Sequence, residues 1–294
     1  MNRFNRILAA SDLSAPARHA AERAALVARD TATPLDLLHV ANLAPLERLQ
    51  RLIGATPLAM EQRVLEAARH VLAALAADLQ QRHGVAVGSH VHTGRLLERL
   101  ALKADELAAG LLVCGARGES VIRHFMLGST AMRLLGTAKC PVLVVKQMPH
   151  ETYRRLLVPV DFSPCSLRVI GHARSIAPQA EIVLLNVCDV PFEGQLRYAS
   201  VDDDTINRYR VVARQEATWK LQALRDEAGL DPDGCSLVVL HGDPTTRIIQ
   251  QEQERDCDLI VLGKHGEGQI EAMLLGSVTK HVLAESQGDV LVSV

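Results

Sequence analysis

The chain contains few aromatic side chains and no closely spaced cysteine pair. Phe, Trp and Tyr make up 3% of the 294 residues, which argues against a base-stacking platform for single-stranded nucleic acid. The six cysteines include no C-x-x-C pair, and we interpret them as reduced and mostly buried. Composition therefore indicates neither a zinc-thiolate site nor a redox pair.

An excess of one charge and long apolar runs are also missing. The net charge is -2 and Lys and Arg form no cluster, so we expect no binding to nucleic acid. Hydrophobic residues make up 48% of the chain, yet their longest runs have the length of a strand, so no transmembrane helix is expected. The start, "MNRFNRILAASD", enters a strand pattern without the apolar core of a signal peptide. We therefore expect a cytoplasmic protein with no membrane partner.

What the chain does contain is a repeat. "GARGESVIRHFMLGS" (115–129) and "GKHGEGQIEAMLLGS" (263–277) have glycines at the same spacing, 148 residues apart. "RILAASDLSAPARHAAERAALVA" is matched by "RLLVPVDFSPCSLRVIGHARSIA", and "LDLLHV" is matched by "EIVLLNV". "HVHTGRLLERL" is matched by "VVLHGDPTTRI" at 148 residues again. Four segments in one order indicate a duplication.

The duplication predicts two domains, residues 1–148 and 149–294, each large enough to bury its own core. A polar segment with one proline, "KQMPHETYRR" (146–155), is the expected linker.

Each domain alternates short apolar strands with helices. The expected strands are 6–11, 35–40, 85–92, 111–115 and 141–145, then 155–160, 181–187, 235–240, 258–263 and 289–294. The expected helices include 15–29, 58–82, 95–109, 129–137 and 203–229, the last with an acidic first turn in "VDDDT". This pattern is typical of a doubly wound α/β fold, a parallel sheet with helices on both faces. We predict two tandem Rossmann-like domains, each a five-stranded parallel sheet in the order 3-2-1-4-5.

In such a sheet, ligands bind beyond the carboxyl ends of the strands, where the strand order reverses. Asp12 follows the first strand and Gly115 ends the fourth, so both should face one crevice. Asp161 and Gly263 should do the same in the second domain.

The glycines suggest what this crevice binds. Gly115 and Gly118 lack a Cβ atom, so backbone N–H groups can turn toward an anion. Gly128 and Ser129 open the next helix, whose free N–H groups and dipole favour phosphate. Neither a P-loop nor a G-x-G-x-x-G fingerprint occurs. The pattern favours a mononucleotide.

The motif G-x-x-G, nine residues, G-[ST], together with Asp12 and Val40, resembles the ATP-binding branch of the universal stress protein family in its tandem form. The resemblance covers essentially the whole chain. It implies that the nucleoside is contacted by Asp12, Val40 and Gly94 and the phosphates by Gly115, Gly118, Gly128, Ser129 and Thr130. It implies the same roles in the second domain for Asp161, Val187, Gly242, Gly263, Gly266, Gly276, Ser277 and Val278. Mg²⁺ would accompany the phosphates.

Some positions differ between the two copies. Arg117 stands where the second loop has His265, and either could touch a phosphate or lie in solvent. The second domain has the family's G-x-P after its third strand, at Gly242, whereas the first has Gly94 followed by Arg and Leu. We expect two sites of unequal affinity, in an order that the sequence leaves open.

We therefore expect an ATP-binding stress or signalling protein in which nucleotide occupancy regulates conformation or assembly. The resemblance implies that the last strands pair the two domains into a pseudo-dimer, with a homodimer and an unknown protein partner as further options. No general base recurs in the two motifs, so no catalytic residue is assigned and hydrolysis is expected to be slow or absent. The alternatives are a slow ATP hydrolase or nucleotidyl-transferring enzyme, and a scaffold with vestigial sites that binds zinc through His90 and His92.

Overall fold

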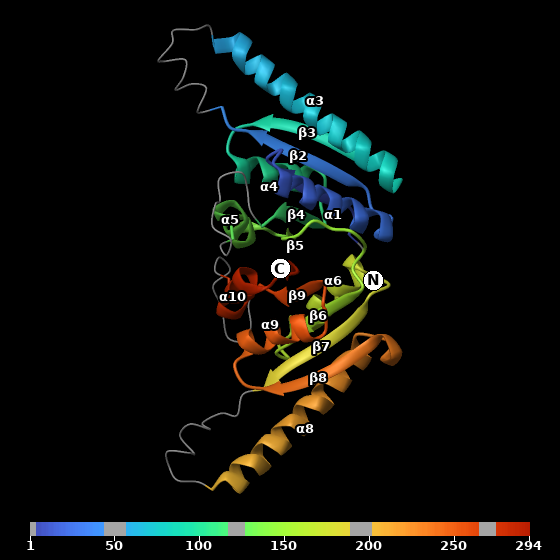
Figure 1. Ribbon diagram of the computed structural model, residues 1–294, viewed down its shortest axis with the longest axis vertical. Helices are drawn as coiled ribbons and strands as arrows, with labels where there is room; N and C mark the ends of the chain where they lie inside the picture. Colours follow the sequence, from blue (N-terminus) through green and yellow to red (C-terminus); the bar gives the residue numbers. More distant parts are fainter. Residues whose placement is uncertain (1–3, 44–56, 117–126, 189–201, 265–274) are drawn as a thin grey trace. The chain divides into compact units, whose positions relative to one another are not determined.

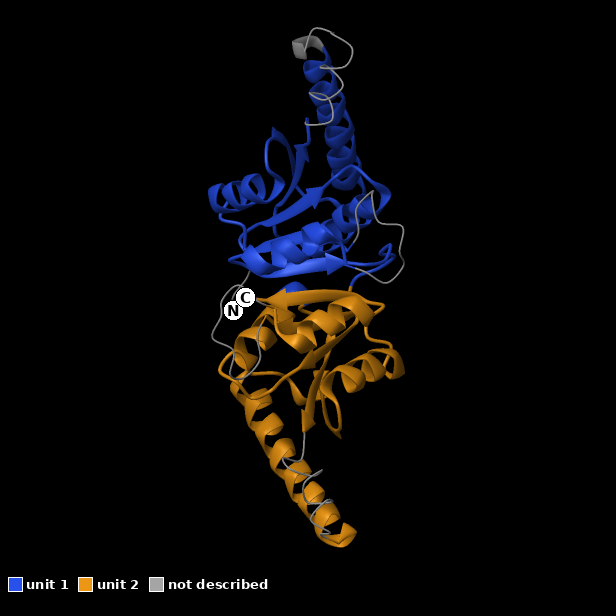
Figure 2. Ribbon diagram, turned by 90° about the vertical axis from the view of Figure 1, so that its left-hand side faces the viewer, with its two compact units in different colours: residues 1–152, 175–177, 294 blue, residues 153–174, 178–293 orange. Residues whose placement is uncertain are grey.

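The computed structural model describes residues 4–43, 57–116, 127–188, 202–264 and 275–294. The chain divides into two compact units (Figure 2). The first comprises residues 1–152, 175–177 and 294, and the second comprises residues 153–174 and 178–293.

The first unit contains five parallel strands (Figure 1). Its elements are β1 (Ile7–Ser11), α1 (Ala15–Thr31), β2 (Leu35–Ala41), α3 (Pro57–His83), β3 (Val87–Thr93), α4 (Leu96–Glu106), β4 (Leu111–Gly115), α5 (Ser129–Thr137) and β5 (Val142–Val145). The strand order is β3-β2-β1-β4-β5, which confirms the order predicted from the sequence.

The second unit repeats this plan. Its elements are β6 (Arg155–Pro159), α6 (Ser166–Ile176), β7 (Glu181–Cys188), α8 (Asp203–Glu227), a 3-10 turn (Pro232–Gly234), β8 (Cys235–His241), α9 (Pro244–Glu254), β9 (Leu259–Gly263), α10 (Ser277–Glu285) and β10 (Asp289–Ser293). The strand order is β10-β9-β6-β7-β8, with neighbouring strands parallel. Numbered along the second unit, this is the same 3-2-1-4-5 order.

The central strands, such as β4 and β9, are largely apolar because helices cover both faces of each sheet. Ile7, Leu35, Leu111 and Val142, one from each of four neighbouring strands, have exposed fractions of 1% or less. In the first unit α1 contacts α3 and α4 contacts α5, and in the second α9 contacts α10. Because the crossovers are right-handed, α1 and α3 cover one face of the first sheet and α4 and α5 cover the other.

The helix ends follow local rules. Asp202 caps α8 by accepting a 2.8 Å hydrogen bond from the N–H of Thr205, so the acidic segment starts this helix as predicted. The helix expected over 95–109 ends at Glu106, because Ala108 has a left-handed φ of 48°. None of the described helices is both long and apolar enough to cross a membrane.

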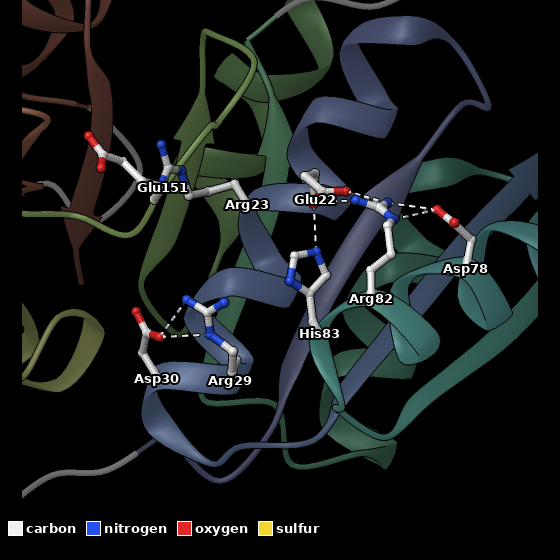
Figure 3. A network of polar contacts seen from close by, with 8 residues as sticks. All are labelled: Glu22, Arg23, Arg29, Asp30, Asp78, Arg82, His83 and Glu151. Atoms are coloured by element: carbon white, nitrogen blue, oxygen red, sulfur yellow. Dashed lines mark hydrogen bonds and ion pairs between the residues drawn. The ribbon is translucent and has the colours of Figure 1, made fainter.

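A polar cluster joins α1 to the C-terminal end of α3 in the first unit (Figure 3). Arg82 donates to both oxygens of Glu22, at 2.8 and 2.6 Å, and to Asp78 at 2.6 Å. The Nε2 atom of His83 lies 2.6 Å from Glu22 Oε1, one of the two oxygens that Arg82 contacts. In the second unit, the end of α8 is instead tied to α6 through Arg174, which donates to the carbonyl of Ala228 at 2.8 Å.

Candidate nucleotide-binding sites

In the first unit four of the predicted nucleotide contacts lie at the carboxyl ends of neighbouring strands. Asp12 follows β1, Val40 is the second-last residue of β2, Gly94 follows β3 and Gly115 ends β4. Because the strands are parallel, these ends form one edge of the sheet, where the strand order reverses between β1 and β4. The fold therefore gathers the four positions at one edge.

The turn after β1 holds the aspartate in place. Asp12 Oδ1 accepts hydrogen bonds from the N–H of Ser14, at 3.0 Å, and from the Ser14 hydroxyl. Between them, Leu13 has a φ of 66°, a left-handed conformation that costs a residue with a Cβ about 1–2 kcal/mol. Ser14 in turn caps α1 through the N–H of Ala17. The carboxylate is thus part of a defined turn.

The turn after β6 has the same design. Asp161 Oδ1 accepts from the N–H of Ser163 at 3.0 Å and from the hydroxyl of Ser166 at 3.2 Å. Phe162 takes a φ of 62°, as Leu13 does in the first unit. Strained residues that recur in the same place are typical of functional sites. The sequence did not predict this strain, because neither residue is a glycine or asparagine.

A second repeated contact supports the neighbouring strand. His39 Nδ1 lies 2.8 Å from the carbonyl oxygen of Ser11. Its counterpart Asn186 donates through Nδ2 to the carbonyl oxygen of Val160 at 2.9 Å. In both units this position therefore ties the end of the second strand to the end of the first.

In the first unit, backbone hydrogen bonds bring together the two ends of the glycine loop. The N–H of Ala116 donates to Val145 at 2.7 Å, and the N–H of Gly128 donates to the carbonyl of Ala116 at 2.8 Å. The end of β4 therefore lies beside the start of α5. Arg117 and Gly118 lie outside the described residues.

The loop of the second unit closes through the same two bonds. The N–H of Lys264 donates to Ser293 at 2.8 Å, and the N–H of Gly276 donates to Lys264 at 3.0 Å. The Lys264 side chain is buried, and this burial lowers the pKa of its ammonium group. His265 and Gly266 lie outside the described residues.

The helices that follow both loops begin without a side-chain cap. Gly128 and Gly276 are the cap residues of α5 and α10. Within the described chain, no side chain accepts a hydrogen bond from the first N–H groups of these two helices. Ser129, Thr130 and Ser277 at the helix starts are exposed. An uncapped helix start presents N–H donors and a partial positive charge, which together suit an anion.

A cleft of about 180 Å³ lies at this edge of the second unit. Four of the predicted contacts line it, namely Asp161, Val187, Gly263 and Val278. Gly242, Gly276 and Ser277 are not among the lining residues. The wall also includes residues that were not predicted as nucleotide contacts, namely Cys165, Asn186, Pro244, Ile248 and Thr279. The space is more than ten times what one water molecule needs.

Both units also place beside a predicted glycine an arginine that was not predicted from the sequence. Gly94 and Gly242 have φ values of 120° and 130°, which side chains with a Cβ rarely adopt. Arg99 Nε donates to the carbonyl of Thr93 at 2.9 Å, and Arg247 Nε donates to the equivalent carbonyl in β8, that of His241, at 3.0 Å. The two arginines are 148 residues apart, so the sequence repeat already indicated that both units need an arginine at this position.

Within the part of the chain that the structure describes, the zinc alternative gains no complete set of ligands. His90 Nε2 lies 2.7 Å from Asp36, whose other oxygen accepts from Arg6 at 2.7 Å. Burial, followed by the charge of Lys103, lowers the pKa of His92, and a nearby ammonium group also repels a metal cation. Among the described residues, no group of three or more His, Cys, Asp or Glu side chains could hold a metal ion.

Comparison with known proteins agrees with this architecture. A universal stress protein of Mycolicibacterium smegmatis is 27% identical over 300 residues, covering 97% of this chain and 96% of that protein. One from Methanocaldococcus jannaschii is 32% identical over 146 residues, which is 49% of this chain and 83% of that protein. The crystal structure of a universal stress protein from Archaeoglobus fulgidus has the same fold, with a TM-score of 0.70, 19% identity and 98% of each chain covered. The sequence profile of the universal stress protein family matches residues 3–146 and again 152–293. The chain therefore belongs to the universal stress protein family and carries two family domains in tandem.

Proposed function

We propose that each unit binds one adenine nucleotide, ATP in the first instance, and that occupancy regulates the conformation or assembly of the protein. The observation that carries the proposal is the cleft of the second unit, where Asp161, Val187, Gly263 and Val278 line one space. An acidic side chain, an apolar wall and the glycine that opens the loop are the groups that a nucleoside and its phosphates require.

Each part of a nucleotide has a chemical counterpart. The Asp161 carboxylate, held by Ser163 and Ser166, can accept hydrogen bonds from ribose hydroxyls. Val187 and Ile248 offer apolar surface to a base. The uncapped start of α10 offers N–H donors to phosphate oxygens, as the start of α5 does in the first unit.

Magnesium would enter with the nucleotide. Mg²⁺ keeps several water ligands and is usually held by phosphate oxygens with few protein groups. The ion would neutralise phosphate charge beside Gly276 and Ser277.

We expect binding rather than catalysis. General-base hydrolysis needs a group that orients the attacking water, and Asp12 and Asp161 are used by their turns and by the proposed contact with the ribose. The outcome of binding is then a shift between conformational states, which requires only that one state bind the nucleotide better than the other.

Two measurements on the full-length chain test the proposal. The purified protein is denatured and the supernatant analysed for adenine nucleotide, and ATP is titrated calorimetrically into nucleotide-free protein with Mg²⁺. We expect released nucleotide or saturable binding. If neither is observed, the proposal is wrong and the vestigial-scaffold alternative is favoured. Steady turnover of ATP at intact sites would favour the hydrolase.

A further inference from the structure

The turn that follows the third strand of each unit differs between the copies in ways that bear on nucleotide binding. In both units the side chain of an arginine packs against a glycine whose backbone has a positive φ. A Cβ atom on Gly94 would lie 3.2 Å from Arg99 Nε, and one on Gly242 would lie 3.1 Å from Arg247 Nε. In both, Nε donates to the carbonyl of the residue before the glycine.

The second unit adds further constraints to this turn. Asp243 caps α9 by accepting from the N–H of Thr246 at 2.8 Å and from its hydroxyl at 2.9 Å. These hydrogen bonds hold the pKa of Asp243 below its usual range. Pro244 fixes φ at the first position of the helix, and Arg247 Nη1 also donates to Gln250 at 2.8 Å.

The first unit has the arginine without the other constraints. Arg95 occupies the cap position of α4 and makes no side-chain capping bond. Leu96 stands where the second unit has the proline. Within the described residues, the Nε bond of Arg99 is the single side-chain hydrogen bond that closes this turn.

In the second unit, the turn after the third strand leads into the wall of the cleft. In the second unit, Pro244 and Ile248 from α9 line the same space as Asp161 and Val187. A turn that is fixed before the ligand arrives avoids the cost of ordering it on binding. A looser turn must be ordered at that moment, so its site binds more weakly.

We propose that Arg99 and Arg247 are positioning residues for the nucleotide sites, and that the fully constrained second site binds first and more tightly. Arg99 alone fixes the wall of the first site, whereas Asp243 and Pro244 share this task with Arg247. The inference depends on the proposed nucleotide binding, and it adds the order in which the two sites fill.

The experiment is a calorimetric titration of the full-length chain with Mg²⁺ and ATP. The first site is isolated by Gly266→Val and the second by Gly118→Val, because we expect a side chain at either glycine to prevent phosphate binding by that loop. In these backgrounds we expect Arg99→Ala to weaken the first site about tenfold and Arg247→Ala to weaken the second about threefold or less.

A gain-of-function variant keeps the test independent of folding defects. Arg95→Asp with Leu96→Pro copies the second turn into the first unit, where Arg95 already has φ -79° and ψ 122°, close to the -69° and 124° of Asp243. We expect this pair to tighten the first site and to restore much of the affinity lost in Arg99→Ala. The midpoint of thermal unfolding is measured for every variant.

The outcomes separate the two claims. Absence of ATP binding in the wild-type chain overturns the proposed function and this inference with it. Binding with equal affinity at both sites, or equal losses from the two arginine variants, overturns this inference and leaves the proposed function in place. A change in the unfolding midpoint with unchanged affinity shows that the arginines are structural only, which also overturns it.

Discussion

Replacing Glu22 by Gln should destabilise the contact between α1 and α3 in the first unit. The side chain of Glu22 is 17% exposed, and it accepts hydrogen bonds from Arg82 and His83 (Figure 3). Hydrogen bonds to a charged group are each worth about 1.5–3 kcal/mol, and exposure of Arg82 reduces this. His83 is nearly buried and its Nδ1 has no partner among the described residues, so a weakened Nε2 bond adds to the cost. We expect a loss of about 1–2 kcal/mol.

The assay and its control follow from the same contacts. Thermal unfolding of the full-length variant should shift by about 2–8 °C, with faster hydrogen exchange in α1 and the end of α3. Asp30→Asn removes the more exposed ion pair with Arg29 nearby and should cost less than about 0.5 kcal/mol. Burial alone would raise the pKa of Glu22, but its hydrogen bonds with Arg82 and His83 lower it overall. Its contribution is therefore complete above the usual glutamate pKa and disappears as the pH falls through the lowered folded-state value. Equal losses in the two variants at neutral pH would refute this reasoning.

Two further predictions concern the second unit. Burial, and then the charge of Arg168, lowers the pKa of His172, whose Nδ1 lies 2.7 Å from the hydroxyl of Ser293. The neutral form is favoured on folding, so stability should be complete above the usual histidine pKa and fall as the pH drops below it. His172→Gln should flatten this dependence in urea unfolding measured from pH 7.5 to 5, and an unchanged slope would contradict the assignment. Asn186→Leu removes the Nδ2 donor to the carbonyl of Val160. We expect the free energy of unfolding to fall by about 1–3 kcal/mol and ATP to bind more weakly in the second unit. Unchanged stability and unchanged affinity in calorimetry would show that this hydrogen bond is dispensable.

Much of the fold was predictable because the information is periodic and duplicated. Apolar strands such as Leu111–Gly115 alternate with helices, and the second copy repeats the order at nearly constant spacing. The glycines of the two loops could be aligned, so their place at the strand ends followed from the topology.

Other features could not be read from residue types. Leu13 and Phe162 adopt left-handed conformations that leucine and phenylalanine normally avoid, and the neighbouring aspartates stabilise those turns. Arg99 resembles any exposed helical arginine until its Nε is seen to donate to a strand carbonyl. Pro244 joins the cleft only through the tertiary packing of α9.

The most direct test of the account is the number of ATP molecules bound per chain. Calorimetry with Mg²⁺ on the nucleotide-free protein should give two for the wild type and one each for Gly118→Val and Gly266→Val, because a side chain at either glycine obstructs the approach of phosphate to its loop. A value of two in both variants would show that the glycine loops do not hold the nucleotide. A value of zero in the wild type would contradict nucleotide binding altogether.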